Sequence, residues 1–371
     1  MISSRWLAVI ASSSILAIGV SACGGGNDSS SGGGGGTISG SGATFPQPVY
    51  SEWANQFQSD DGITVNYQGI GSGGGIAQFT AGTVDFGATD APMEDSEVAA
   101  AQKKGEPVHI PTVFGAVTVS YNLDGVESGL KLDGATIADI FLGKITKWND
   151  PAIAKLNPGV SLPGDDITVV HRSDESGTTA LFTTFLSDYS PEWKSQVGAD
   201  KTVKWPTGTG ANGNDGVAGA IQQTSGSIGY VEQAYALQNG FTTADVKNAA
   251  GSYVGPSLAS TSAAGEGIKV PPDLRFVAIN SPNPKAYPIA SSTFLLVYQD
   301  MCKAGVSQTT AENVKAWLEY ALGPGQGIAP KLQYAPEPTA IAQMADQKID
   351  GLQCNGKPLK SSVKVKGYPA S

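Results

Sequence analysis

Three segments of the sequence place glycine and hydroxyl residues directly before an amphipathic helical pattern. They are residues 40–46 (GSGATFP), residues 69–75 (GIGSGGG) and residues 176–178 (SGT). Glycine lets the backbone approach a ligand that a Cβ atom would keep away. The first turn of a helix offers N–H groups without intrahelical partners at the positive end of the helix dipole. One such segment alone is usually an ordinary helix cap, but three that converge would bind an anion with neutral donors.

An arginine and two aspartates are charged residues that could belong to the same site. Arg172 ends a predicted strand four residues before Ser176, and Asp174 lies between them. A guanidinium presents a planar fork of donors to a tetrahedral oxyanion, and Asp174 can hold that fork in place. Asp90, in the segment DFGATDAP, is either a turn residue or an acceptor in the same site. An acceptor there suits an anion that carries a proton, as phosphate does at neutral pH and sulfate does not.

The N-terminus has the pattern of an export signal. One positive charge, Arg5, precedes an apolar run at residues 6–20, which is too short to span a bilayer comfortably and has the size of a signal-peptide core. The run ends in VSAC, which resembles the lipobox of bacterial lipoproteins, with Cys23 as the acylated residue. A plain secretory peptide with an incidental cysteine is the alternative. We therefore expect a signal peptide at residues 1–22 and a lipid anchor on Cys23, at the extracytoplasmic face of the membrane.

The composition that follows excludes some classes of protein. Residues 23–36 are mostly glycine and serine, which predicts a flexible tether. Once the signal peptide is removed, 22 basic residues face 33 acidic residues, a formal net charge of −11. Such a chain has no general attraction for nucleic acid, so local geometry must bind any anion. About 335 residues remain, which suggests two domains.

The rest of the chain alternates short apolar runs with helical patterns, which is typical of an α/β protein. The apolar segment at residues 108–121 could pass from one lobe into another, and the Ser/Ala/Gly-rich segment at residues 251–267 is expected to be an exposed excursion. Cys302 and Cys354 form either a disulfide, which export permits, or two buried thiols. Strands are predicted at residues 63–68, 167–170, 276–279 and 294–298.

Seven ordered segments carry a family resemblance. The chain resembles the periplasmic phosphate-binding proteins of ABC-type phosphate importers along nearly its whole mature length. The matching segments are SGSGATFPQPVY (39–50), VNYQGIGSGGGI (65–76), VDFGATDAPM (84–93), FLGKITKWNDPAI (141–153), HRSDESGTT (171–179), TVKWPTGTGANGNDGV (202–217) and SIGYVEQAYA (227–236).

The resemblance implies a fold and a function. The fold is α/β, a two-lobed type II periplasmic binding protein with two hinge crossovers and the ligand in the interlobe cleft. Residues 37–117 and 286–371 would form lobe I, and residues 118–285 lobe II. The implied function is high-affinity binding of inorganic phosphate and its delivery to the transmembrane permease of an ABC importer, by a monomer without cofactor or metal.

The resemblance also assigns residues to the site. Asp174 would support Arg172. Residues 251–267 and 334–338 match the family only loosely, and the family does not require the pair Cys302 and Cys354. The implied phosphate contacts are Thr44, Phe45 through its backbone, Ser72, Asp90, Arg172, Ser176, Gly177 and Thr178.

Three other functions compete with this interpretation. An enzyme that acts on phosphate esters is disfavoured because His109 and His171 lack metal-ligand spacing and no G-x-S-x-G motif occurs. A dinucleotide-binding dehydrogenase rests on two G-x-G-x-x-G matches, at residues 69–74 and 208–213, which are weak in a glycine-rich exported chain. A binding protein for sulfate or molybdate conflicts with Asp90, whereas arsenate carries the same proton as phosphate.

Overall fold

The computed structural model describes residues 35–368. The predicted signal peptide, Cys23 and all of the predicted tether except Gly35 and Gly36 lie outside these residues. No helix within residues 35–368 is long and apolar enough to cross a membrane.

Strands and helices alternate along most of the described chain, as expected for an α/β protein. The strands are β1 (Thr37–Gly42), β2 (Thr64–Gly69), β3 (Phe86–Thr89), β4 (Pro107–Asn122), β5 (Lys131–Leu132), β6 (Thr168–Arg172), β7 (Thr209–Ala211), β8 (Ser227–Glu232), β9 (Thr242–Thr243), β10 (Asp245–Lys247), β11 (Tyr253–Val254), β12 (Ala290–Tyr298), β13 (Ala335–Pro336), β14 (Gln353–Cys354) and β15 (Lys357–Pro358). The helices are α1 (Gln47–Asp61), α2 (Ser72–Ala81), α3 (Asp95–Ala101), α4 (Gly134–Phe141), α5 (Pro151–Leu156), α6 (Gly177–Tyr189), α7 (Pro191–Gln196), α8 (Gly213–Gln223), α9 (Gln233–Gln238), α10 (Leu258–Gly265), α11 (Gln308–Leu322), α12 (Thr339–Asp350) and the 3-10 helices η1 (Pro324–Gly327) and η2 (Ala329–Leu332).

The main sheet has two halves that share one long strand. Its strand order is β2-β1-β3-β12-β4-β8-β6-β7. β4 pairs with β12 as far as Ala116 and with β8 from Val117 onward, so this strand passes from one half into the other. We call the half with β2, β1, β3 and β12 lobe I, and the half with β8, β6 and β7 lobe II. The apolar segment at residues 108–121, predicted to connect two lobes, lies in this crossing strand.

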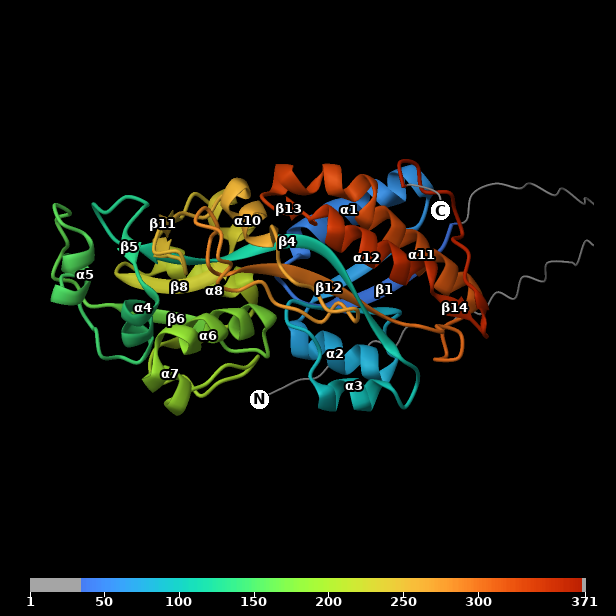
Figure 1. Cartoon of the computed structure of the whole chain (residues 1–371), viewed down its shortest axis with the longest axis horizontal. Helices are drawn as coiled ribbons and strands as arrows, with labels where there is room; N and C mark the ends of the chain where they lie inside the picture. Colours follow the sequence, from blue (N-terminus) through green and yellow to red (C-terminus); the bar gives the residue numbers. More distant parts are fainter. Residues whose placement is uncertain (1–34, 369–371) are drawn as a thin grey trace, which may run out of the picture. The chain divides into compact units, whose positions relative to one another are not determined.

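Helices cover both faces of the sheet in lobe I (Figure 1). α1, α11 and α12 lie over one face, and α2 and α3 over the other. In α1 the buried side chains Val49, Trp53 and Phe57 recur every four residues and therefore share one side of the helix. Trp53 and Phe57 pack against Trp317 of α11, with ring centroids 6.2 and 5.6 Å apart. This apolar packing fixes the turn between β1 and α1, which contains the first predicted motif.

Lobe II is also a sheet between two layers of helices. Because neighbouring side chains of a strand point to opposite faces, Tyr230 and Val231 of β8 face different helices. Tyr230 stacks on Phe182 of α6 at a centroid distance of 4.3 Å. Val231 belongs to a cluster with Val217 and Ile221 of α8. These two layers hold the end of β6, which is followed by the third predicted motif.

Two predictions about the fold are wrong. Residues 276–279 form no strand, because the N–H of Ala278 donates to the side-chain Oγ of Ser291 instead of to a neighbouring strand. The segment at residues 251–267 is not simply exposed, because it contains α10. A capping box between Ser257 and Ser260 begins this helix, and its small residue Ala264 is fully buried. Elsewhere in the chain, Cys302 and Cys354 form a disulfide.

Candidate anion-binding site

The strand order places the predicted motifs together at the carboxyl ends of neighbouring strands. β1 pairs in parallel with both β2 and β3, so the carboxyl ends of the three strands lie together. Thr44 follows β1, Ser72 follows β2 and Asp90 follows β3 directly. β6 delivers Arg172 and the first turn of α6 from lobe II. Ligand sites of open α/β sheets are usually formed by such loops at strand ends.

The first turns of α2 and α6 meet through Ser72. Its Oγ accepts hydrogen bonds from the backbone N–H of Gly177 at 3.0 Å and from that of Asp90 at 3.3 Å. A Cβ atom added to Gly177 would lie 2.6 Å from Ser72 Oγ and 2.7 Å from Asp90 Cβ. Only glycine therefore allows these two helix termini to approach this closely.

Arg172 is buried, with 3% of its surface exposed, and Asp174 holds its guanidinium. Nε donates to Asp174 Oδ1 at 2.7 Å, Nη2 donates to Oδ2 of the same carboxylate, and Nη1 donates to Thr178 Oγ1 at 3.3 Å. The Gly213 N–H also donates to Asp174, at 3.1 Å. Burial would raise the pKa of Asp174, but its hydrogen bonds and ion pair with Arg172 outweigh burial and lower it. The ionised Asp174 therefore holds the guanidinium of Arg172 in a fixed orientation in the site.

Asp90 lies beside these donors and has no ion-pair partner within residues 35–368. It is 1% exposed, and the Thr293 hydroxyl donates to its Oδ1 at 2.8 Å. Burial raises the pKa of Asp90 to about 7, against the opposing effects of the Thr293 hydrogen bond and the Arg172 charge. At neutral pH this carboxyl group can consequently exchange a proton with a ligand.

Asn214, the second residue of α8, connects the donors of the two lobes. Its Nδ2 donates to Thr44 Oγ1 at 2.9 Å and to Thr178 Oγ1 at 3.2 Å, and its backbone N–H also donates to Thr44 Oγ1, at 3.1 Å. Its Oδ1 accepts from the Glu232 N–H at 2.9 Å, which fixes the orientation of the amide. Both threonine hydroxyls thus accept hydrogen bonds from Asn214 and keep their own hydrogen for a ligand.

The two remaining predicted residues shape the backbone. Phe45 is fully buried, and its carbonyl accepts a hydrogen bond from the Tyr334 hydroxyl at 2.7 Å. Ser176 caps α6, because its Oγ accepts from the Thr179 N–H at 3.1 Å. Both contacts hold a turn in place beside the donors.

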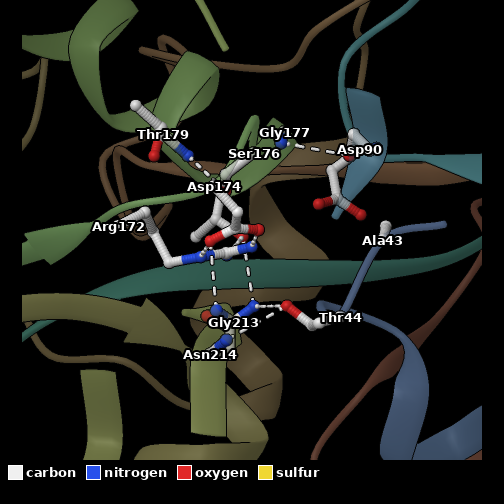
Figure 2. A network of polar contacts seen from close by, with 12 residues as sticks. Ala43, Thr44, Asp90, Arg172, Asp174, Ser176, Gly177, Thr179, Gly213 and Asn214 are labelled. Carbon is white, nitrogen blue, oxygen red and sulfur yellow. Dashed lines mark hydrogen bonds and ion pairs between the residues drawn. The ribbon is translucent and has the colours of Figure 1, made fainter. Parts of the chain in front are cut away.

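Figure 2 shows the side chains of Thr44, Asp90, Arg172, Asp174 and Asn214 converging on one region. Every predicted contact residue is buried, and the hydrogen bonds described above link them, directly or through the next residue in the chain, into one network. The sequence reasoning missed Asn214, Gly213 and Thr293. The signal for the first two is the segment GANGNDG, which lies in one of the quoted family segments and overlaps the weak G-x-G-x-x-G match at residues 208–213.

The contacts of the two histidines indicate structural rather than ligand-binding roles. His171 stacks on Trp205 at a centroid distance of 4.6 Å, and burial lowers its pKa. His109 accepts the Met93 N–H at 3.1 Å, and burial lowers its pKa to about 3. Within residues 35–368, no group of three or more His, Cys, Asp or Glu side chains could hold a metal ion.

Comparison with known proteins identifies the family. The PBP superfamily domain matches residues 27–324. The phosphate-binding protein PstS of Haemophilus influenzae is 44% identical over 82% of this chain and 90% of its own length. The PstS protein of Pasteurella multocida is 42% identical over 87% of this chain and 93% of its own length. The chain belongs to the PstS family of phosphate-binding proteins.

A solved structure of another phosphate-binding protein has the same fold. A high-affinity periplasmic phosphate-binding protein (PfluDING), solved with bound phosphate, aligns with 88% of this chain and 96% of its own at a TM-score of 0.69. Its sequence identity is 23%, so this likeness concerns the fold. The two-lobed α/β architecture of this chain is thus shared with that solved structure.

Proposed function

We propose that this chain binds inorganic phosphate outside the membrane with high affinity and delivers it to the permease of an ABC-type phosphate importer. The site supplies a guanidinium, threonine and serine hydroxyls and the N-terminal turns of two helices, which are the donors that an oxyanion requires. The membership in the PstS family supports the same ligand.

Asp90 is the residue that would make the site prefer phosphate to sulfate. A buried carboxylate repels an anion unless a proton lies between them, and the hydroxyl of hydrogen phosphate provides that proton. Sulfate would place an oxygen against the carboxylate oxygen without a proton, so its binding should be weaker. Arsenate has the same protonated form as phosphate and should fit the site.

The crossing strand supports an assignment of the lobes. We assign residues 37–117 and 286–371 to lobe I and residues 118–285 to lobe II. β4 changes its partner between Ala116 and Val117, which agrees with the first boundary. The site residues come from both lobes, so opening and closing at the hinge would release and enclose the ligand.

The chain acts as a binding protein rather than an enzyme in this proposal. The site residues are buried and tightly linked by hydrogen bonds, so an enclosed anion has no room for the leaving group of a phosphate ester. We also propose that the protein is a monomer, because its ligand site is complete within one chain.

Isothermal titration of the soluble mature domain tests the ligand. We expect phosphate to bind with a dissociation constant at least 100-fold lower than that of sulfate or molybdate at pH 8, and arsenate to compete with phosphate. Tighter binding of sulfate or molybdate would contradict the proposal.

The lipid anchor is a separate part of the proposal. We infer from the VSAC sequence that Cys23 is acylated and holds the protein at the extracytoplasmic face of the membrane. Metabolic labelling with a radioactive fatty acid should mark the parent chain and leave the Cys23→Ser variant unlabelled. Equal labelling of both chains would contradict the anchor.

A further inference from the structure

Lys201 is a buried lysine at the contact between the two lobes. It lies in lobe II between α7 and β7, and only 4% of its side chain is exposed. Its Nζ lies 3.0 Å from Oε1 of Glu97, in the first turn of α3 in lobe I, and 3.4 Å from Oε1 of Glu94, the residue that caps this helix. Lysines are rarely buried unless they are paired, so the closed arrangement of the lobes surrounds this ammonium group with its partners.

The backbone of Lys201 connects this ion pair to the candidate site. Its carbonyl accepts a hydrogen bond from the N–H of Ser176 at 2.9 Å. Ser176 caps α6, whose first residue donates to Ser72 of lobe I. A second hydrogen bond between the two lobes is donated by the Gly73 N–H to the Glu175 carbonyl at 3.0 Å. A displacement of Lys201 would therefore move the donors of α6.

The electrostatic surroundings explain why a cation is needed there. Burial would lower the pKa of Lys201, but Glu97 and Glu94 outweigh burial and raise it, so the side chain stays charged. Burial raises the pKa of nearby Glu175, Lys201 lowers it, and Glu97, Asp200 and Glu94 raise it further. One ammonium group thus neutralises part of a cluster of four carboxyl groups beside an anion site.

We propose that Lys201 is a positioning residue that holds the lobes closed over the bound anion through its ion pairs with Glu94 and Glu97. The ion pairs join residues of different lobes, so they form on closure and must break before the anion leaves. The inference rests on the proposed binding of phosphate. It concerns the residence time of the ligand, because the side chain contacts the opposite lobe rather than the site itself.

Rapid-mixing kinetics with a fluorescent reporter on the soluble domain tests this role. In Lys201→Met, which keeps most of the side-chain volume, we expect phosphate to dissociate about 10–100 times faster, with a smaller change in the association rate. Lys144→Met is the matched control, since Lys144 also lies beside two carboxylates, Asp139 and Glu192, but all three belong to lobe II. Its dissociation rate should equal that of the wild type.

A partner variant keeps the test informative if Lys201→Met folds poorly. Glu97→Gln removes one carboxylate from α3 and should also speed dissociation. The double variant should dissociate no faster than Lys201→Met alone, because both substitutions remove the same ion pair. A wild-type dissociation rate in Lys201→Met, or independent effects of the two substitutions, would overturn the proposed role of Lys201. The proposed binding of phosphate would be unaffected. A wild type that fails to bind phosphate would overturn the proposed function and this inference together.

Discussion

The hydroxyl oxygen of Ser72 accepts a hydrogen bond from the backbone N–H of Gly177 at 3.0 Å. Ser72 is the first residue of α2 in lobe I, and Gly177 is the first residue of α6 in lobe II. The bond therefore joins two helix N-termini across the interlobe contact. Because both termini carry the positive end of a helix dipole, they would repel each other less with an anion between them. A bound anion would thus favour closure of the two lobes.

The contribution of Arg172 should exceed that of Ser72. Its guanidinium makes charge-assisted contacts worth about 1.5–3 kcal/mol each, against about 1 kcal/mol for a neutral hydroxyl. We expect Arg172→Ala to weaken phosphate binding by a larger factor than Ser72→Ala in isothermal titrations at the same pH and salt. Equal losses of affinity in the two variants would mean that the guanidinium contacts Asp174 but not phosphate.

Thr293 should set the pH at which sulfate is rejected. Burial raises the pKa of Asp90 to about 7, and the Thr293 hydrogen bond opposes this rise. Protonated Asp90 can donate to sulfate, whereas ionised Asp90 repels it, so sulfate affinity should fall as the pH rises through about 7. In Thr293→Val the pKa of Asp90 is higher, and the fall in affinity should move to higher pH.

Competition of sulfate against labelled phosphate from pH 5.5 to 9 measures this dependence. Sulfate is a good probe because it does not itself titrate in this range. The wild-type affinity should fall by up to about tenfold per pH unit above the pKa of Asp90. A sulfate affinity independent of pH in both proteins would contradict the assigned protonation of Asp90.

Glu337 should make the ligand-free protein less stable as the pH rises. It is buried, its Oε2 accepts from Ser292 at 3.0 Å, and its Oε1 has no partner within the described residues. Burial raises the pKa of Glu337 to about 8, against the opposing Ser292 hydrogen bond. The folded chain therefore holds a proton that the unfolded chain releases above pH 4.5. Its stabilising contribution is full below that pH and is lost as the pH rises through about 8.

The Glu337→Gln variant removes this proton. Between pH 5 and 8 the free energy of unfolding of the wild type should fall relative to the variant by up to about 1.4 kcal/mol per pH unit. Chemical unfolding at pH 5, 6.5 and 8, without phosphate, measures the difference. Glu52→Gln, at an exposed position of α1, is the control and should follow the wild type. Parallel curves for wild type and Glu337→Gln would show that this carboxyl group does not titrate in the folded protein.

The sequence predicted the local structure around several residues of the candidate site. Ser72 and Ser176 stand at helix starts, and Arg172 ends a strand, so their types and neighbours indicated an oxyanion site. Thr293 could not be found in this way. It reaches Asp90 only because β12 pairs antiparallel with β3, and this pairing joins parts of the chain 203 residues apart. The contact is a property of the sheet order rather than of a motif.

Errors in the fold have similar causes. The composition of residues 251–267 suggested an exposed segment, but small side chains also let α10 pack closely on the protein. A Cβ atom on Gly265 would lie 2.6 Å from the Pro338 ring, so the glycine allows this contact. Residues 276–279 have an apolar pattern and no partner strand, and periodicity alone does not reveal whether a partner exists.

We expect Asp90 to select phosphate by accepting its proton, and one comparison tests this role directly. Phosphate and sulfate dissociation constants should be measured by calorimetry for the wild type and for Asp90→Asn at pH 8 and matched salt. The amide of asparagine can donate a hydrogen bond to sulfate, so the preference for phosphate should shrink by about 1–3 kcal/mol, about 5- to 150-fold in the ratio of the two constants. An unchanged ratio would contradict this role, because Asp90 would then play no part in the selection of phosphate over sulfate.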